Sequence, residues 1–352
     1  MPDYLNKKVK AIEVGPNKSI SKLLSEMSHT GFQGKSLAKV VDVFESMIKD
    51  KDLTIFLGYA GSLSTTGQWK IINWLIENRY IDVLIPTGAN ITEDIVEAMG
   101  FAYWQGSHNT NDSDLFSEGL NRYYDVYGKE TDYLEMTELI ADFILTLDEN
   151  ENYTSRGFLK LFGKWLLEKD IKSIVATAAE NDVPIFCPAI ADSPYGDAAL
   201  IAKSRGFSLK IDAMQDYVEF MQMAEHVKES GVVYIGGGVP KDFIQLFAVT
   251  SDLLYENRYV PNREGGLHRK DVGDSETYYP HKYAIQITTD SPQWGGLSGC
   301  TFEEAVSWGK ENPEGGLVQC YCDATIALPI VSHAISERVD GKRKGSILGY
   351  ED

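Results

Sequence analysis

The chain has 352 residues, of which 43% are hydrophobic, and a formal net charge of −19. This length is enough to bury the core of one large α/β domain or of two ordinary ones. The charge disfavours a nucleic-acid partner, because phosphate binding requires a basic face and none is visible, but it suits cationic small molecules. No apolar run approaches the roughly 20 residues that span a bilayer, and the polar opening MPDYLNKKVK lacks the apolar core of a signal peptide. We therefore expect a cytoplasmic protein with no membrane partner.

The predicted elements begin with two helices, Ser19–Met27 and Lys35–Lys49, in an N-terminal helical arm over residues 1–50. After Lys51, short apolar runs alternate with amphipathic segments, which predicts an α/β fold with a doubly wound parallel sheet. The predicted strands are Leu53–Leu57, Ile81–Ile85, Ile174–Ala176, Ile185–Cys187, Val232–Ile235, Ala284–Thr288 and Val318–Cys322. The predicted helices among them lie near Gly67–Asn78, at Thr92–Met99, from Pro240 onward and through Val331.

Residues 100–170 interrupt this alternation with aromatic and acidic sequence and one predicted helix around Leu134–Leu147. We interpret them as a helical insertion in a single catalytic domain that covers residues 51–352. The segment Asn257–His281 is polar and contains glycines, so we expect a surface loop there. Its arginines and one of its histidines are Arg258, Arg263, Arg269 and His268.

Neither histidines nor cysteines point to a metal site. The six histidines show no HExxH or comparable spacing, and His333 falls in a predicted helix, which favours a structural role. Because Cys320 and Cys322 lie in an apolar run, buried free thiols are favoured over disulfides or metal ligands. The four cysteines are Cys187, Cys300, Cys320 and Cys322.

Segments that follow the predicted strands are candidates for ligand binding, because ligands of doubly wound sheets bind beyond the carboxyl ends of the strands. The first such segment, Gly58–Gly67, has small residues, hydroxyls and backbone N–H groups that suit a pyrophosphate, although Ser and Thr are also common helix caps. The second, Thr87–Asp94, places Glu93 where it could take a ribose hydroxyl or an amine. Glu93 and Asp94 could equally just stabilise a helix N-terminus.

Three later segments complete this set. Cys187–Asp197 carries two carboxylates around a turn, and its last residue could instead cap the next helix. The triple glycine Gly236–Gly238 is entropically costly, which indicates a ligand or another backbone against it, or structural tightness alone. The segment from Asp290 to Gly299 leads to a lysine-containing octapeptide, and the strand ending at Cys322 delivers Asp323 and Ala324 to the same face.

The octapeptide Glu303–Lys310 sets one lysine beside a tryptophan and two carboxylates. Lysine attacks a carbonyl or imine only as the neutral amine, and its reference pKa of about 10.4 means that an apolar wall is needed to destabilise the cation. Trp308 could provide that wall and Glu304 could hold a cationic substrate. The alternative is a solvated lysine at a helix end with Trp308 in the core.

These segments together resemble deoxyhypusine synthase, in order, over about residues 50 to 335. The most specific match is Glu304-Ala-Val-Ser-Trp-Gly-Lys310. The other matching segments are Gly58–Gly67, Thr87–Asp94, Pro188–Asp197, Gly236–Lys241 and Tyr321–Ala324. The resemblance implies the Rossmann-like fold of that family, NAD as cofactor, and a homotetramer with sites at subunit interfaces. In that family the N-terminal helices cover these sites, and residues 1–50 could do likewise.

The reaction that the resemblance implies is an NAD-dependent transfer of a 4-aminobutyl group. The cofactor takes hydride from the carbon beside the secondary amine of spermidine, and diaminopropane leaves the resulting imine. The lysine captures the butylamine unit as an enzyme imine, a second amine displaces it, and NADH reduces the product. A neutral lysine, an amine-binding carboxylate and a dinucleotide-sized crevice are each required for this chemistry.

The resemblance also assigns roles to individual positions. Lys310 becomes the imine-forming nucleophile, with Asp242 and Glu304 in the catalytic set. The polyamine-binding positions correspond to Glu93, Asp197, Glu304 and Trp308. The NAD-contacting positions correspond to Ser62, Thr65, Thr87, Gly88, Ala89, Asp192, Gly237, Asp323 and Ala324.

Departures from the eukaryotic pattern concern the polyamine site. Asp242 stands where a Lys-His-His run supplies an active-site histidine. Leu297 stands where a Gly-Ser-Asp-Ser-Gly loop supplies a polyamine-binding aspartate, and Trp294 replaces a nearby cofactor-contacting aspartate. Because a buried ammonium without a partner is costly, Asp242 or Asp290 is a candidate to compensate.

We therefore expect an aminobutyl transferase that acts on spermidine or putrescine and passes the group to a free diamine, making homospermidine. The close alternative is authentic deoxyhypusine synthesis on a lysine of translation initiation factor 5A. A conventional dehydrogenase and a non-catalytic relative that binds NAD or polyamine are the remaining alternatives. Retention of Lys310, Glu304 and Asp197 argues against the non-catalytic relative, because these side chains have little structural need to persist.

Overall fold

The computed structural model describes residues 5–255 and 279–350, which divide into two compact units. Unit 1 comprises residues 1–56, 78–80 and 223–352, and unit 2 comprises residues 57–77 and 81–222. Most of the predicted surface loop Asn257–His281, including His268 and the three arginines, lies outside the described residues.

The larger sheet is parallel and has the strand order β2-β1-β6-β7-β8. Its strands are β1 Leu53–Tyr59, β2 Val83–Pro86, β6 Glu229–Ile235, β7 His281–Thr288 and β8 Glu311–Tyr321. All residues of β1 and β2 are buried, as expected for strands covered on both faces. Because the order extends from β1 in both directions, the predicted doubly wound parallel sheet is confirmed.

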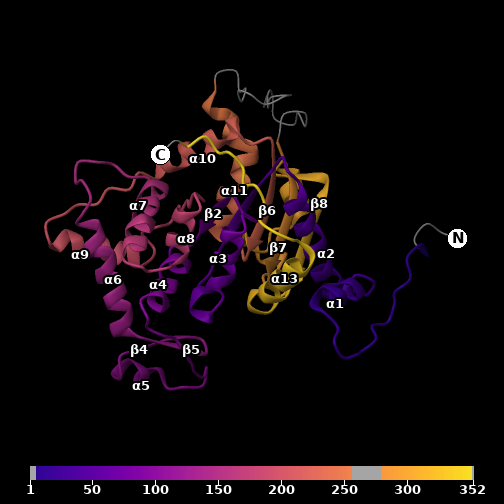
Figure 1. Cartoon of the computed structure of the whole chain (residues 1–352), viewed down its shortest axis with the longest axis horizontal. Helices are drawn as coiled ribbons and strands as arrows, with labels where there is room; N and C mark the ends of the chain where they lie inside the picture. Colours follow the sequence, from indigo (N-terminus) through magenta and orange to yellow (C-terminus); the bar gives the residue numbers. More distant parts are fainter. Residues whose placement is uncertain (1–4, 256–278, 351–352) are drawn as a thin grey trace. The chain divides into compact units, whose positions relative to one another are not determined.

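Unit 1 surrounds β6, β7 and β8 with helices (Figure 1). β6 pairs with β7 from Gly231 opposite Tyr283 onward, and β7 pairs with β8 as far as Thr288 opposite Tyr321. The helices are α1 Ile20–Met27, α2 Phe32–Lys49, α11 Gly238–Thr250, α12 Phe302–Ser307 and α13 Ala324–Arg338. The Lys39 ammonium of α2 donates to the Leu317 carbonyl of β8 at 2.8 Å, so α2 is joined to the sheet. The division of the chain at residue 50 stays a prediction.

Unit 2 contains the predicted insertion, which is not purely helical. Besides its helices it holds a small antiparallel sheet with the order β3-β5-β4. These strands are only two to four residues long and mostly half-buried or exposed, so they carry no readable apolar alternation. The strands are β3 Trp104–Gln105, β4 Leu120–Tyr123 and β5 Val126–Lys129. The helices of unit 2 are α3 Trp69–Glu77, α4 Glu93–Ala98, α5 Asp112–Ser117, α6 Glu130–Ile144, α7 Ser155–Glu168, α8 Ile174–Glu180, α9 Pro194–Ser204 and α10 Ala213–Gln222.

The predicted strand Ile174–Ala176 is wrong, because these residues begin helix α8. The Ser173 hydroxyl accepts the Ala176 N–H at 3.1 Å, and the Asp94 carboxylate accepts the Ile174 N–H at 2.5 Å. Two free N–H groups of the first turn are thereby satisfied. A three-residue apolar run does not distinguish a buried strand from a buried helix, and the cap decides it here.

The predicted strand Ile185–Cys187 is present only as one parallel bridge between Ile185 and Leu84 of β2. The Leu84 N–H donates to the Pro184 carbonyl and the Phe186 N–H to the Leu84 carbonyl, both at 3.0 Å. The prediction is right about extended pairing at this place and wrong about its length.

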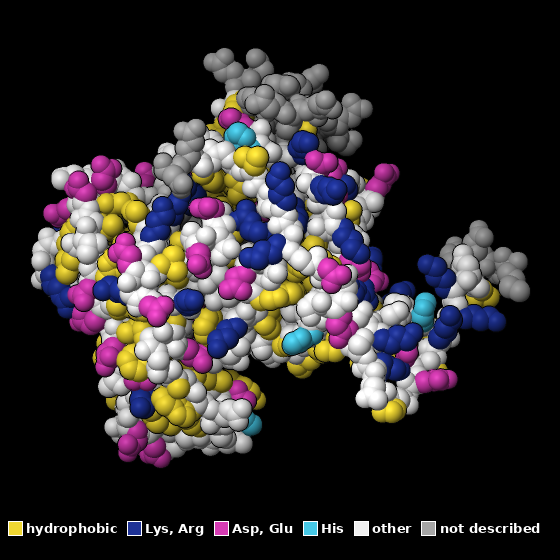
Figure 2. All heavy atoms as spheres, in the orientation of Figure 1, with side chains coloured by type: hydrophobic (Ala, Val, Ile, Leu, Met, Phe, Trp, Pro, Cys, Tyr) yellow, Lys and Arg dark blue, Asp and Glu magenta, His cyan; other side chains and the backbone are white. Residues whose placement is uncertain are grey.

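The charged side chains, the cysteines and the hydropathy of the helices each bear on an expectation from the sequence. On the face shown in Figure 2, acidic side chains are interspersed with Lys and Arg. All four cysteines are free thiols, and Cys187 and Cys320 are buried. Within residues 5–255 and 279–350, no helix is long and apolar enough to cross a membrane.

Candidate active site

The octapeptide Glu303–Lys310 folds as a short helix followed by a tight reversal into β8. The Thr301 hydroxyl caps α12 by accepting the Glu304 N–H at 3.2 Å. At the other end, Gly309 has φ +76°, its N–H donates to the Val306 carbonyl at 2.9 Å, and the Lys310 N–H donates to the Ala305 carbonyl at 3.0 Å. This pair of bonds is the Schellman motif, which uses a left-handed glycine to end a helix. The glycine before the lysine therefore turns the chain so that Lys310 enters the sheet edge.

The Lys310 side chain is not a solvated helix-end lysine. Lys310 is only 9% exposed, and its Nζ donates to Asp242 Oδ1 at 2.9 Å and to Gln245 Oε1 at 3.5 Å. Asp242 and Gln245 lie on the same face of α11, three residues apart. The Lys310 Nζ also lies 5.5 Å from the centre of the Trp308 ring, which is 64% exposed rather than part of the core.

A pocket of about 490 Å³ in unit 1 opens beside this lysine. Two carboxylates, Asp242 and Glu304, reach it, while much of the remaining wall is apolar. Its lining residues are Asp242, Leu246, Val249, Thr250, Pro292, Gly295, Gly296, Leu297, Cys300, Glu304, Trp308 and Lys310. Such a pocket suits a molecule with cationic ends and a short apolar chain.

The polar pair behind the lysine has no counterpart in the sequence prediction. Gln245 Nε2 donates to Glu311 Oε1 at 2.9 Å, and both side chains are buried. Burial raises the pKa of Glu311 to about 7, against the lowering effects of the Gln245 hydrogen bond and of Lys241 and Lys310. A charged residue directly after Lys310, at the start of β8, is the signal that could have identified Glu311.

A second lysine anchors the loop that forms one wall of the pocket. Lys241 is fully buried and donates to Gln286 Oε1 at 3.0 Å and to the carbonyls of Leu297 and Cys300 at 3.2 and 2.8 Å. Burial lowers the pKa of Lys241. An added Cβ on Gly237 would lie 2.4 Å from Ser298 Cα. The triple glycine therefore lets the backbone around Ser298, in the loop that Lys241 anchors, approach Gly237 closely. This close packing explains the entropic cost of the glycines without a ligand at that point.

In unit 2, the acidic candidate Glu93 lies among the hydroxyl-rich loops Gly58–Gly67 and Thr87–Asp94. The Ser62 hydroxyl donates to the Glu93 carboxylate at 2.7 Å, and Asn90 Nδ2 donates to Thr87 Oγ1 at 3.0 Å. Burial raises the pKa of Glu93 to about 7, and the Ser62 hydrogen bond opposes it. Asn90 also accepts the Leu63 N–H at 2.8 Å, so it joins both loops. An asparagine inside a predicted ligand loop is the signal in the sequence that could have identified Asn90.

Three further candidates of unit 2, Gly88, Asp192 and Asp197, lie around the start of α9. Ser193 is the N-cap, and an added Cβ on Gly88 would lie 2.3 Å from its hydroxyl, so the Gly88 turn packs against this loop. Asp192 precedes the cap, and Asp197 is in the first turn of the helix; both are exposed. The other two predicted cofactor positions of this unit are Thr65 and Ala89, in short 3-10 turns.

In unit 1, Asp323 and Ala324 do not line the lysine pocket. Asp323 is the N-cap of α13 and accepts the Thr325 N–H at 2.7 Å. Asp290 is also outside the pocket lining, and its Oδ1 accepts the Ser291 N–H at 2.9 Å. Of the two aspartates considered for compensation, the one that contacts the lysine is therefore Asp242.

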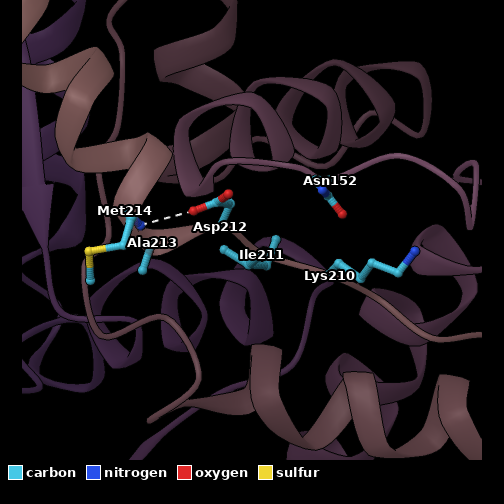
Figure 3. A pocket seen from close by; sticks show the side chains of 6 residues that line it. All are labelled: Asn152, Lys210, Ile211, Asp212, Ala213 and Met214. Atoms are coloured by element: carbon cyan, nitrogen blue, oxygen red, sulfur yellow. Dashed lines mark hydrogen bonds between the residues drawn. The ribbon is translucent and has the colours of Figure 1, made fainter.

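A second pocket, of about 300 Å³, lies in unit 2 (Figure 3). The Asp212 carboxylate accepts the N–H groups of Met214 and Gln215 at 3.1 and 2.9 Å and so serves the first turn of α10. The Lys210 side chain extends away from Asp212, and its Nζ donates to the Glu149 carbonyl at 3.1 Å. The Asp212 carboxylate and the Lys210 ammonium of this pocket are thus both occupied in local hydrogen bonds.

The fold is α/β, and unit 1 holds a pocket in which a buried lysine side chain pairs with a carboxylate. A sequence model of the family described as "DS: Deoxyhypusine synthase" matches residues 22–335. The chain belongs to the deoxyhypusine synthase family, which is a family of transferases.

Individual relatives support this membership. Over 338 residues the chain is 43% identical to "Probable deoxyhypusine synthase 2" of Methanosarcina acetivorans, covering 95% of this chain and 92% of the relative. It is 35% identical over 331 residues to "Probable deoxyhypusine synthase 1" of the same organism, covering 94% and 95%. A structure titled "Crystal Structure of a putative deoxyhypusine synthase from Entamoeba histolytica" shares the fold, with a TM-score of 0.61 at 18% identity, covering 96% of this chain and 99% of that one.

Proposed function

We propose that the protein is an NAD-dependent 4-aminobutyl transferase that takes the group from spermidine or putrescine and passes it to a free diamine. The observation that carries the proposal is the buried Lys310 Nζ, 2.9 Å from Asp242 Oδ1, in a pocket that also presents Glu304 and apolar walls. A lysine in such a place forms imines with carbonyl or iminium carbons.

Six of the pocket residues have proposed roles in this reaction. Lys310 Nζ attacks the carbon of the aminobutyl unit, and Asp242 is placed to take the proton that Nζ must lose first. Trp308, Leu246 and Leu297 exclude water along the methylene chain. Glu304, at the pocket wall, holds the distal ammonium of the donor or acceptor.

The composition of the unit 2 loops that carry the predicted contacts supports NAD as the cofactor. An added Cβ on Gly61 or Gly67 would meet nothing within 4 Å, and both have positive φ, so the loop bends at its glycines beside open space. Hydroxyls of Ser62, Thr65 and Thr87 line the same loops, a composition suited to phosphates and ribose. When bound, NAD supplies the acceptor and later the donor of hydride.

The free-diamine acceptor is favoured by the altered pocket. Leu297 lines it where the eukaryotic pattern has a carboxylate, and Asp242 presents its charge at Lys310 instead. The chain is 43% identical to the "Probable deoxyhypusine synthase 2" of Methanosarcina acetivorans but only 35% identical to the "Probable deoxyhypusine synthase 1" of that organism. This difference also fits a branch of the family with its own substrate.

In the deciding experiment, the enzyme is incubated with NAD and spermidine, together with either putrescine or translation initiation factor 5A. Homospermidine and the modified factor are measured by mass spectrometry. We expect homospermidine and diaminopropane with putrescine. Modification of the factor with no homospermidine would replace the free-diamine proposal with authentic deoxyhypusine synthesis. NADH release without any transfer would indicate a dehydrogenase.

We also infer from the family that the protein is a cytoplasmic homotetramer with active sites at subunit interfaces. The mass of one chain is 39.2 kDa. Light scattering should therefore give a mass about four times larger, and a monomer mass would contradict this inference.

A further inference from the structure

The side of Lys310 that faces away from the pocket holds a second acidic group, connected through one amide. Gln245 Oε1 accepts from Lys310 Nζ at 3.5 Å, and Gln245 Nε2 donates to Glu311 Oε1 at 2.9 Å. Gln245 is fully buried and Glu311 is 1% exposed. In the part of the chain that the structure describes, Glu311 Oε2 has no hydrogen-bond partner.

The orientation of the Gln245 amide decides which of its ends Lys310 meets. An amide has a donor end and an acceptor end, and an ammonium is stabilised only by the acceptor. Because Glu311 accepts from the Nε2 end, the Oε1 end is turned toward Lys310. Asp242 and Gln245 thus present two oxygens to one Nζ from one face of α11.

The charge of Glu311 is set by groups on several elements. Lys241 on α11 and Lys310 beside it favour the carboxylate, whereas burial favours the neutral acid and is the largest effect. Tyr234 on β6 is buried, and its hydroxyl has no hydrogen-bond partner among the described residues; Glu311 contributes to raising its pKa. His281 of β7 lies opposite Glu311 in the register, and its Nδ1 lies 2.8 Å from the Ser230 hydroxyl. The titratable groups around Glu311 and Lys310 include Lys241, Asp242, Tyr234, His281, Cys300 and Glu304.

We propose that Glu311 is a positioning residue of the transferase reaction, which through the Gln245 amide holds Lys310 as a cation against Asp242 until a substrate occupies the pocket. This inference rests on the proposed function. The Glu311 carboxylate stabilises the ammonium that cannot react, and the same field later stabilises the cationic imine on Lys310, which the acceptor amine attacks. When Glu311 takes up a proton, this field disappears and the Lys310 amine is freed more easily.

Reductive alkylation of Lys310 tests the proposal without NAD or polyamine. Butanal is the probe: the neutral amine adds to its carbonyl, water leaves, and cyanoborohydride delivers hydride to the imine carbon. Peptide mass spectrometry gives the alkylation rate of Lys310 relative to exposed Lys51 in the same sample. The wild-type chain is compared with Glu311→Gln, which keeps an acceptor for Gln245 but removes the charge.

The readout is the ratio of the variant rate to the wild-type rate at each pH between 5.5 and 8.5. Glu311 is neutral at the acid end in the wild type, so the ratio should be close to one there. It should rise to about tenfold, with a midpoint near the pKa of Glu311 at about 7. A ratio that is constant with pH, or a variant slower than wild type at pH 8, would overturn the proposal, since a purely structural role has no such midpoint.

Glu311→Met is the second variant, with similar volume and no charge. It should give the same rise with pH as Glu311→Gln, and a rise in only one of the two would also count against a charge effect. Because butanal alkylation requires no transferase turnover, it reports on Glu311 even if the acceptor experiment disproves the proposed function.

Discussion

Asp242 gives Lys310 an acidic neighbour where the eukaryotic pattern has a histidine. A histidine at that position would be neutral over much of the physiological range, whereas an aspartate places a full negative charge 2.9 Å from Lys310 Nζ. The sequence was sufficient to single out Lys310, because its motif is specific, and to suggest Asp242 as a replacement partner. It could not reveal Gln245, because an uncharged side chain in an amphipathic helix gives no pattern.

Replacing Lys310 with Arg should abolish aminobutyl transfer, with a loss of about 10³-fold or more, because a guanidinium keeps the charge but supplies no neutral nucleophile. Product formation from spermidine and putrescine is measured by mass spectrometry. Lys172→Arg, at an exposed position, is the matched control and should retain full activity. Turnover by Lys310→Arg at the wild-type rate would rule out the covalent mechanism.

Asp242→Asn should lower kcat by about 10²-fold, because the amide keeps the shape but cannot take a proton from Lys310. Asp290→Asn is the control, since Asp290 is outside the pocket lining and hydrogen-bonds its neighbour Ser291. Steady-state kinetics of both variants distinguish the two aspartates. Equal losses of kcat in the two variants would contradict a role of Asp242 as the group that takes the proton from Lys310.

At the level of elements, the sequence predicted the strands of the larger sheet and the helices α1, α2, α3, α4, α6, α11 and α13, because their apolar periodicity is strong. It missed α7 and α10, which are 14 and 10 residues long, and it also failed where an element is short. The run Ile174–Ala176 is helical because Ser173 caps it, and strands β3, β4 and β5 were too short to show alternation. Helix α8 also lies close to α7: Gly163 of α7 faces the Val175 carbonyl.

Gly163→Ala tests that close approach. The added Cβ would lie 2.5 Å from the Val175 carbonyl oxygen and 2.7 Å from Ala179 Cβ, so the helices must separate. We expect a loss of about 1–3 kcal/mol in the free energy of unfolding. Gly34→Ala in α2 is the control, because its nearest neighbours are at 3.6 Å, and it should gain about 0.5–1 kcal/mol from helix propensity. Urea denaturation measures both; similar effects at both glycines would exclude the packing explanation.

For the whole molecule, a group of buried acids links stability to pH. Burial is the largest cause that raises the pKa values of Glu93, Asp94 and Glu311 to about 7 and of Asp216 to about 6. A carboxyl whose folded pKa lies above its unfolded pKa binds more protons in the folded state. Its contribution to stability is present at low pH and is lost as the pH rises from the unfolded to the folded value.

Asp94→Asn should therefore weaken this pH dependence. Asp94 is fully buried and accepts the Ile174 N–H, a bond that an asparagine oxygen can keep. Between pH 4.5 and 7.5 the wild type should lose of the order of 3 kcal/mol more unfolding free energy than the variant. Urea titrations at both pH values give the difference, which is insensitive to other carboxyls common to both proteins. Parallel losses in the two proteins would show that Asp94 does not ionise in this range.

The division of the chain has a consequence for its synthesis on the ribosome. Unit 2 is complete once residue 222 has emerged, whereas unit 1 needs residues from both ends of the chain, 1–56 and 223–352. The N-terminal helices must therefore wait for β7 and β8, and β1, whose neighbour β2 is synthesised early, must wait for its other neighbour β6. During that interval the apolar face of α2 is exposed, so the nascent chain should depend on chaperones at this stage more than the finished protein does.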